Sequence, residues 1–278
     1  MLEVFENENV TCCKLERKWK GIRINPVYVF LVDGMLIDTG PKCFEEQLVH
    51  FYERHSFDAA VLTHSHEDHS GTAPWIEQNR GVPIYIHENG IEICSRPHPY
   101  PLYRRLIWGK RDAFAPRALS RTIHSRNYEW EVIYSPGHAD DHVAFFNKET
   151  GQLFSGDLFV HTSMKVIMNT ESIPVTMASI RKLLAYDFGS MFCCHAGYIP
   201  DGKSKLKEKL DNLENLCGEV QHLYEQGLSV KEINKKLFPK KYPVTFISRG
   251  EWDSLHIVSS IIEHVKTEKS LHTSNTTL

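Results

Sequence analysis

Residues 64–69, of sequence His-Ser-His-Glu-Asp-His, place three imidazoles and the Asp68 carboxylate within six positions. Imidazole nitrogen and carboxylate oxygen are ligands that suit zinc, iron and manganese. The spacing of His64 and His66 suits an extended or turn segment rather than one face of a helix. These two rings can turn to one side of such a loop, and Asp68 and His69 can turn to the other. The segment therefore predicts a metal site, and metal-assisted hydrolysis is the chemistry that we expect first.

Three later residues with metal-binding side chains also follow short apolar runs. They are His138 after the run 130–134, Asp157 after 152–154 and His195 after 190–194. Loops that follow strands can converge at one rim of a sheet. Each of these residues alone is more typical of a packing side chain or a turn. Together with residues 64–69 they indicate one shared site.

Short predicted strands and helices surround these residues. Strands are predicted at 27–32, 35–38, 59–63, 82–86, 130–134, 142–146, 152–154 and 190–194, and helices at 44–55, from 72 onward and at 175–185. Asp33-Gly34 predicts a hairpin turn between the first two strands. This order favours an α/β protein whose mixed sheets are covered by helices. Separate all-β and all-α parts fit less well, because the helical signals interrupt the strand series.

The size and charge of the chain exclude several classes of protein. Its 278 residues, 41% of them hydrophobic, predict one large domain or a domain with an appendage. A formal net charge of −3 gives no general attraction to nucleic acid or to a membrane surface. No apolar run reaches the roughly 18 residues of a membrane-spanning helix, and residues 1–6 lack the features of a secretory signal. Seven cysteines without a CxxC motif fit a reducing, cytoplasmic setting.

The order of the motifs resembles that of the metallo-β-lactamase-fold hydrolases. The matching patterns are Ile-Asp-Thr-Gly at 37–40, Thr-His-x-His-x-Asp-His at 63–69, Ser-Pro-Gly-His at 135–138 and Ser-Gly-Asp at 155–157. The resemblance covers about residues 20–202, and it is specific for the fold and the metal site but not for the substrate. It departs at 194–197, where the chain has Cys-His-Ala-Gly and the family often has Gly-His-Gly. Since the histidine is retained, the departure affects packing more than ligation.

This resemblance implies a four-layer αββα sandwich with two metal sites. The first metal would be held by His64, His66 and His138, the second by Asp68, His69 and His195, and Asp157 would bridge them. Two divalent ions are therefore implied, with zinc as the first choice and iron or manganese as alternatives. The absence of a cysteine at the Asp157 position argues against the antibiotic-hydrolysing zinc lactamases that use a thiolate there.

Residues around the predicted metals are assigned separate roles. Asp68 is expected to orient the attacking hydroxide as well as to bind metal, and is a candidate catalytic residue. Asp38 is expected to accept a hydrogen bond from a ligand histidine or from the backbone. Tyr198, three residues after His195, is a candidate donor to a developing oxyanion, although a packing tyrosine is more common. His142 is expected to be structural.

Residues 96–121 differ from the rest of the chain, since they hold seven Arg or Lys side chains and one acidic residue, interleaved with aromatic residues. The related hydrolases often carry a substrate-covering insertion in this part of the chain. Arg104 and Arg105 are predicted to meet an anionic group of the substrate, and Trp108 to add an apolar wall. The alternative is a solvated basic helix.

Two parts of the chain are expected. Residues 1–203 are predicted to form the catalytic domain, and residues 204–278 a helical C-terminal region that resembles a winged-helix or helical cap. Ser229, with Glu232 three residues later, predicts a helix start in that region. The tail from about 267 is expected to be disordered.

Three classes of function remain open. The first is a hydrolase of a small thioester, ester or lactone, which resembles the hydroxyacylglutathione hydrolases (glyoxalase II). The second is a metal-dependent nuclease or phosphodiesterase, which is less favoured because acidic residues balance the lysines of 204–265. The third is a di-iron or binding protein that does not hydrolyse its ligand. We expect a small, anionic substrate and no membrane partner, and a homodimer is a further expectation because many relatives dimerise.

Overall fold

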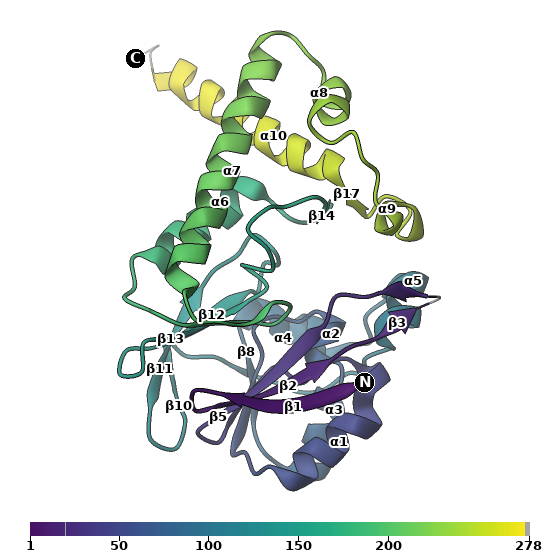
Figure 1. Ribbon diagram of the computed structural model, residues 1–278, viewed down its shortest axis with the longest axis vertical. Helices are drawn as coiled ribbons and strands as arrows, with labels where there is room; N and C mark the ends of the chain where they lie inside the picture. Colours follow the sequence, from purple (N-terminus) through teal and green to yellow (C-terminus); the bar gives the residue numbers. More distant parts are fainter. Residues whose placement is uncertain (20, 276–278) are drawn as a thin grey trace.

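Two mixed sheets packed face to face form the centre of the protein in the computed structural model, which describes residues 1–19 and 21–275 (Figure 1). The first sheet has the order β1 (Leu2–Asn7), β2 (Val10–Leu15), β5 (Val27–Val32), β6 (Met35–Ile37), β7 (Ala59–Val61), β8 (Ile84–Ile86) and β9 (Arg117–Ala118). The second has the order β10 (Thr122–His124), β11 (Glu129–Tyr134), β12 (Val143–Asn147), β13 (Gln152–Gly156), β15 (Met191–Cys193) and β16 (Gly197–Ile199). A separate pair joins β3 (Lys18–Trp19) to β4 (Ile22–Arg23).

Strand direction brings the candidate ligands to one rim. β6 runs parallel to β7 in the first sheet, and β13 runs parallel to β15 in the second. β11 is antiparallel to β12, which is antiparallel to β13, so β11 and β13 point the same way. The carboxyl ends of these strands therefore lead into loops at a common edge within each sheet.

The strand β5 shows why the centre of the molecule is apolar on both faces of the first sheet. Phe30 and Val32 pack between the two sheets, whereas Val29 and Leu31 pack against the outer helices. Because successive side chains of a strand point to opposite faces, a strand covered on both sides is a continuous apolar run. The ring of Phe30 lies 5.5 Å from that of Phe154 in the second sheet.

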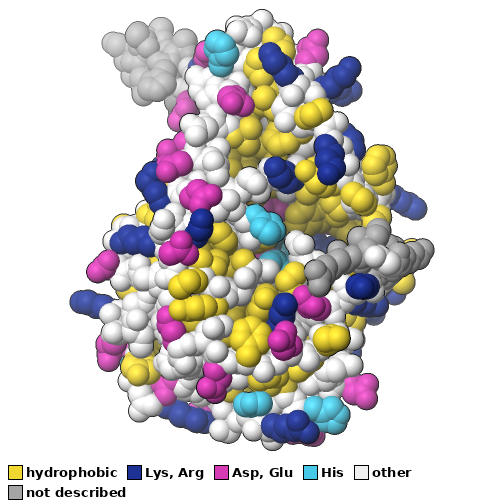
Figure 2. Space-filling view, viewed as in Figure 1, with side chains coloured by type: hydrophobic (Ala, Val, Ile, Leu, Met, Phe, Trp, Pro, Cys, Tyr) yellow, Lys and Arg dark blue, Asp and Glu magenta, His cyan; other side chains and the backbone are white. Residues whose placement is uncertain are grey.

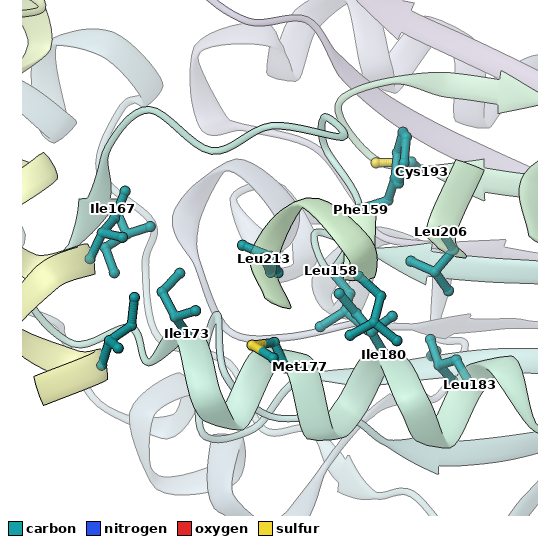
Figure 3. Packing of buried hydrophobic residues seen from close by; sticks show 14 of the residues in the cluster. Leu158, Phe159, Ile167, Ile173, Met177, Ile180, Leu183, Cys193, Leu206 and Leu213 are labelled. Atoms are coloured by element: carbon teal, nitrogen blue, oxygen red, sulfur yellow. The ribbon is translucent and has the colours of Figure 1, made fainter. Parts of the chain in front are cut away.

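Helices cover the outer faces and complete the four-layer αββα sandwich. The first sheet is covered by α1 (Glu45–Arg54), α3 (Ala73–Arg80) and α4 (Glu88–Ser95), and the second by α6 (Ile173–Leu184) and α7 (Gly202–Glu225). Figure 3 shows Met177 and Ile180 on the face of α6 that is turned toward Leu213 of α7. Shorter segments near the rim are η1 (Lys42–Phe44), α2 (Glu67–Ser70) and α5 (Leu102–Trp108).

The C-terminal region is helical, as predicted, and it contains α8 (Val230–Leu237), α9 (Pro243–Ile247) and α10 (Ser254–Asn275). The predicted capping box of Ser229 and Glu232 starts α8. The expected boundary at 203/204 falls within the first turn of α7, and one apolar cluster runs from the second sheet through α7 to α10. The strand β17 (Trp252–Asp253) pairs with β14 (Ile167–Met168), so this region shares backbone hydrogen bonds with the part before it.

The expected disordered tail is instead largely helical, because α10 continues to Asn275. An ion pair of 3.2 Å between Lys269 and Glu225 joins this end of α10 to α7. Residues 276–278 of the predicted tail lie outside the described part of the chain. Within the described part, no helix is both long enough and apolar enough to cross a membrane.

Candidate metal centre

The hexapeptide at 64–69 begins as an extended loop and ends as a helix. His64 and His66 follow β7, and His66 is the N-cap of α2, with φ −58° and ψ 148°. Asp68 and His69 lie in α2 itself. The prediction of an extended or turn segment is therefore correct for His64 and His66, which precede α2, whereas this short helix presents Asp68 and His69.

The three later candidates reach the same place. His138 follows β11, Asp157 follows β13 and His195 follows β15. The Nε2 atom of His138 lies 3.1 Å from Nδ1 of His66, and Nε2 of His195 lies 3.0 Å from Oδ2 of Asp157. The rims of the two sheets thus bring all seven predicted ligand side chains into one cluster.

The cluster divides into two groups with one connecting residue. The first group is His64, His66 and His138, and the second is Asp68, His69 and His195; in each, the candidate ligand atoms all lie within 4.8 Å of one another. Asp157 forms a further set of the same size with His64 of the first group and His69 of the second. Oδ2 of Asp157 lies 3.5 Å from Nε2 of His138 and 3.4 Å from Nε2 of His69. Asp157 is therefore placed between the two groups. Figure 2 shows histidine side chains at a hollow between the sheet-bearing half of the molecule and the C-terminal helices.

The electrostatics of the cluster suit a cation. Burial alone would raise the pKa of Asp157, but the rings of His195 and His69 outweigh burial and hold that pKa well below its usual value. Burial also disfavours the charged form of His195, yet the carboxylates of Asp157 and Asp68 raise its pKa well above the usual value. A bound metal ion would take the place of such protons beside the carboxylates.

Two buried polar atoms give a direct test of whether a metal fits. Nε2 of His69 and Oδ1 of Asp157 have no hydrogen-bond partner among the described residues. An unpaired buried polar atom is costly, so such atoms in a native site usually have a ligand that satisfies them. Burial and the neighbouring rings hold the pKa of His64 and His66 well below the usual value, which leaves them as neutral imidazoles. The donor set is therefore that of a site for zinc, iron or manganese.

Asp38 supports His69, a member of the second ligand group, through its carboxylate. Its carboxylate is fully buried and accepts hydrogen bonds from the backbone N and Oγ1 of Thr63. Nδ1 of His69 lies 2.8 Å from Oδ2 of Asp38, and the Cys194 thiol donates to the same oxygen. This arrangement leaves Nε2 of His69 as the free ring nitrogen, in the way that carboxylates orient ligand histidines. The contact expected between Asp38 and a ligand histidine is present.

Two supports of the ligand histidines were not predicted. Nδ1 of His138 lies 3.2 Å from Oε2 of Glu171, and Nδ1 of His195 donates to the backbone oxygen of Pro26 at 2.7 Å. Both supports come from distant parts of the chain. His142, expected to be structural, accepts a hydrogen bond from the backbone N of Asp157 at 3.0 Å.

A family model described as "Metallo-beta-lactamase superfamily" matches residues 23–195, which is more than half of the chain and includes every residue of the cluster. The chain belongs to the metallo-beta-lactamase superfamily. The expectation from its motifs is therefore confirmed for the family and the fold.

Relatives within this superfamily have names that indicate hydrolysis. "Probable metallo-hydrolase YqjP" of Bacillus subtilis is 25% identical over 266 residues, which cover 79% of this chain and 82% of that protein. An "Atrochrysone carboxyl ACP thioesterase" of Aspergillus fumigatus is 24% identical over 184 residues, covering 64% and 52%. A solved metallo-beta-lactamase family protein from Thermus thermophilus has a TM-score of 0.70 at 19% identity, with 94% of each chain covered, and supports the fold. The chain is a hydrolase of the metallo-beta-lactamase superfamily.

The superfamily motif that contains His138 depends on a glycine at the preceding position. Gly137 has φ +130°, and a Cβ there would lie 2.5 Å from Oγ1 and 2.6 Å from N of Thr176 in α6. We expect Gly137→Ala to lower the free energy of unfolding by about 1–3 kcal/mol, the cost of a strained backbone conformation. Urea denaturation measures this change. Gly189→Ala is the matched control because nothing lies within 4 Å of its Cβ position; an equal loss in both variants would contradict the expectation.

The structure does not bring Tyr198 to the cluster. Its hydroxyl donates to Oε1 of Glu8 at 2.9 Å. Glu8 also accepts hydrogen bonds from Gln152 at the start of β13 and from Ser190 just before β15. The hydroxyl thus lies toward the edge where these strands begin, whereas Asp157 follows the end of β13. The Tyr198 hydroxyl therefore lies away from the cluster at which the oxyanion was predicted to develop.

The three residues predicted to contact substrate have different positions. Arg104 pairs with Glu67, with Nε 2.5 Å from Oε1, so its guanidinium is bound within the protein rather than free for a substrate anion. Trp108 is half-buried and packs against the core outside the first sheet. Arg105 is exposed and lines a cavity of about 290 Å³ together with Lys110. Of the two arginines, Arg105 is the exposed one, and no ion pair within the described residues occupies it.

Proposed function

We propose that this hydrolase uses two divalent metal ions to cleave a small thioester, ester or lactone. The division of seven ligand side chains into two groups, with Asp157 between them, is the observation that supports two ions. Zinc is the first choice, and iron and manganese are alternatives because the same donor atoms bind all three. Bound at the cluster, the ions would supply Lewis acidity that activates water and polarises the substrate carbonyl.

The side chains of the cluster would hold the ions and orient the attacking water. His64, His66 and His138 would hold one ion, and Asp68, His69 and His195 the other. Asp157 would hold both in place. Asp68 remains ionised in this setting, since the adjacent His69 and His195 lower its pKa against the effect of burial. Its carboxylate can therefore accept a hydrogen bond from the attacking water and orient it.

An acyl substrate is favoured by the relatives, one of which is named a thioesterase. The cavity lined by Arg105 and Lys110 also contains His98 and Tyr100, and it has no acidic residue in its lining. Arg105 and Lys110 have no carboxylate partner within the cavity, so they would bind an anionic part of the substrate there. We also propose a reducing, cytoplasmic setting, because all seven cysteines are free.

A substrate panel tests this function. Purified protein loaded with zinc, manganese or iron is assayed on an acyl thioester, a lactone and bis-(p-nitrophenyl) phosphate, and its metal content is measured by mass spectrometry. We expect two equivalents of metal and hydrolysis of at least one acyl substrate. Hydrolysis of the phosphodiester alone would overturn the acyl assignment, and one equivalent of metal in the fully active protein would overturn the dinuclear assignment.

A further inference from the structure

Glu67 lies between two candidate ligands, His66 and Asp68, but belongs to neither ligand group. Its side chain is only 1% exposed and pairs with Arg104 of α5. Nε of Arg104 lies 2.5 Å from Oε1, and Nη2 lies 2.6 Å from Oε2. Such a two-point contact fixes the orientation of both groups as well as their distance. The turn that carries the ligands is therefore joined to α5.

The same guanidinium also reaches the C-terminal region. Nη1 of Arg104 lies 3.4 Å from Oε1 of Glu251, which directly precedes β17, and 3.6 Å from Sδ of Met168 in β14. The side chains of Arg104 and Glu251 are 14% and 20% exposed. One arginine thus connects three segments, with Glu67 at a sequence separation of 37 residues and Glu251 at 147.

This contact differs from an ordinary surface ion pair. Exposed pairs contribute little because water and salt screen them, but Glu67 is buried, so its charge depends on its partner. Within α5, Ile107 is buried and Trp108 packs half-buried against the core, whereas Leu102 is 66% exposed and Leu106 is 49% exposed. Packing of Ile107 and Trp108 holds α5 to the core, and the ion pair of Arg104 with Glu67 joins α5 to the ligand turn.

We propose that Arg104 is a positioning residue for the reaction: by binding Glu67 and Glu251 together, it fixes the turn that presents His66 and Asp68 and holds the C-terminal segment against it. The reaction in question is the one proposed above, so the inference rests on that function. Without Arg104, the Glu67 carboxylate stands unpaired beside the ligands, and the turn loses its link to both α5 and β17. The role is indirect, and it differs from the substrate contact that the sequence predicted.

Kinetic measurements distinguish a positioning role of Arg104 from direct binding of the substrate. Arg104→Gln is expected to lower kcat by about 10–100-fold, the effect typical of groups that orient metal ligands. The loss should be the same for an anionic and a neutral thioester, with little change in KM. A rise in KM confined to the anionic thioester would overturn the proposal in favour of direct substrate binding. Arg104→Lys keeps the charge but not the two-point contact, so it should restore part of kcat.

A double-mutant cycle tests whether Arg104 acts through its ion pair with Glu67. If Arg104 acts through Glu67, then Glu67→Gln combined with Arg104→Gln should lose little more than the worse single variant, because contacting residues are not additive. Multiplicative losses in kcat would overturn the proposal. Arg96→Gln is the matched control, since Arg96 also pairs with a glutamate, Glu92, but both side chains are more than 70% exposed. It should keep the wild-type kcat.

The positioning role of Arg104 can also be tested without a substrate, by measuring how readily each variant loses metal to a chelator. We expect Arg104→Gln and Glu67→Gln to lose metal to a chelator about 10–100-fold more readily than the wild type, and Arg96→Gln to behave as the wild type. If the wild-type protein hydrolyses no acyl substrate, the proposed function fails, and the chelator titration still decides the positioning role. Unchanged metal retention with unchanged kcat in a folded Arg104→Gln variant would overturn it.

Discussion

Replacing Asp157 by alanine is expected to reduce kcat by more than about 100-fold and to remove both metal ions. The reason is its central place, because Oδ2 lies 3.0 Å from Nε2 of His195 and 3.5 Å from Nε2 of His138, which belong to different ligand groups. Loss of a residue that only orients a ligand already costs about 10–100-fold in metal affinity or activity. Loss of a residue that connects both ligand groups should therefore lower metal affinity and activity by more than this.

The comparison with His66 makes this expectation specific. His66 contacts His64 and His138, within 3.0 Å and 3.1 Å, and has no place in the second group. We expect His66→Ala to retain about one equivalent of metal and Asp157→Ala to retain almost none, as measured by mass spectrometry after dialysis. Equal metal contents in these two variants would argue against a bridging role for Asp157. Full metal content with wild-type kcat in both would refute the site as a whole.

Much of the fold could be predicted because its central strands are covered on both sides. The strand at 27–32 was predicted with the observed bounds, and the turn after it has positive φ at both Asp33 (47°) and Gly34 (78°). The strand β1 (Leu2–Asn7) was not predicted. It is an edge strand with no fully buried residue, and its apolar residues, Leu2, Val4 and Phe5, do not keep a regular alternation with polar ones. The neighbouring β2 (Val10–Leu15) was also not predicted although four of its residues are buried, because its sequence, Val-Thr-Cys-Cys-Lys-Leu, is neither a continuous apolar run nor a regular alternation.

The metal-ligand candidates could be predicted from the sequence, whereas the groups that support them could not. The ligands occur in short motifs after apolar runs, so local sequence identifies them. Glu171 and the carbonyl of Pro26 support His138 and His195 through contacts that only the folded chain forms. The basic stretch at 96–121 was misleading for the same reason. Arg104 is bound to Glu67, and Arg111 is 1% exposed and donates to the backbone oxygens of Ile93 and Cys94.

Asp38→Ala is expected to weaken both the fold and the site. Thr63 would lose the acceptor of its backbone N and its hydroxyl, and Nδ1 of His69 would lose a partner at 2.8 Å. One buried group left unpaired costs about 1–3 kcal/mol, so we expect at least that loss in the free energy of unfolding. Because His69 would also be free to rotate, metal affinity and kcat should fall by about 10–100-fold. Urea denaturation and a metal titration measure the two effects.

Asp33 provides the matched control for this prediction. Both aspartates have positive φ, 57° at Asp38 and 47° at Asp33, and both accept several hydrogen bonds. Asp33, however, binds Ser125 and Asn127 at the hairpin turn that precedes β6, whereas the ligand loops follow the ends of the strands. Asp33→Ala should therefore lower the free energy of unfolding without lowering metal affinity. If Asp38→Ala also left metal affinity unchanged, its contact with His69 would matter for stability alone, and the orientation of that ring would have to come from the fold around it.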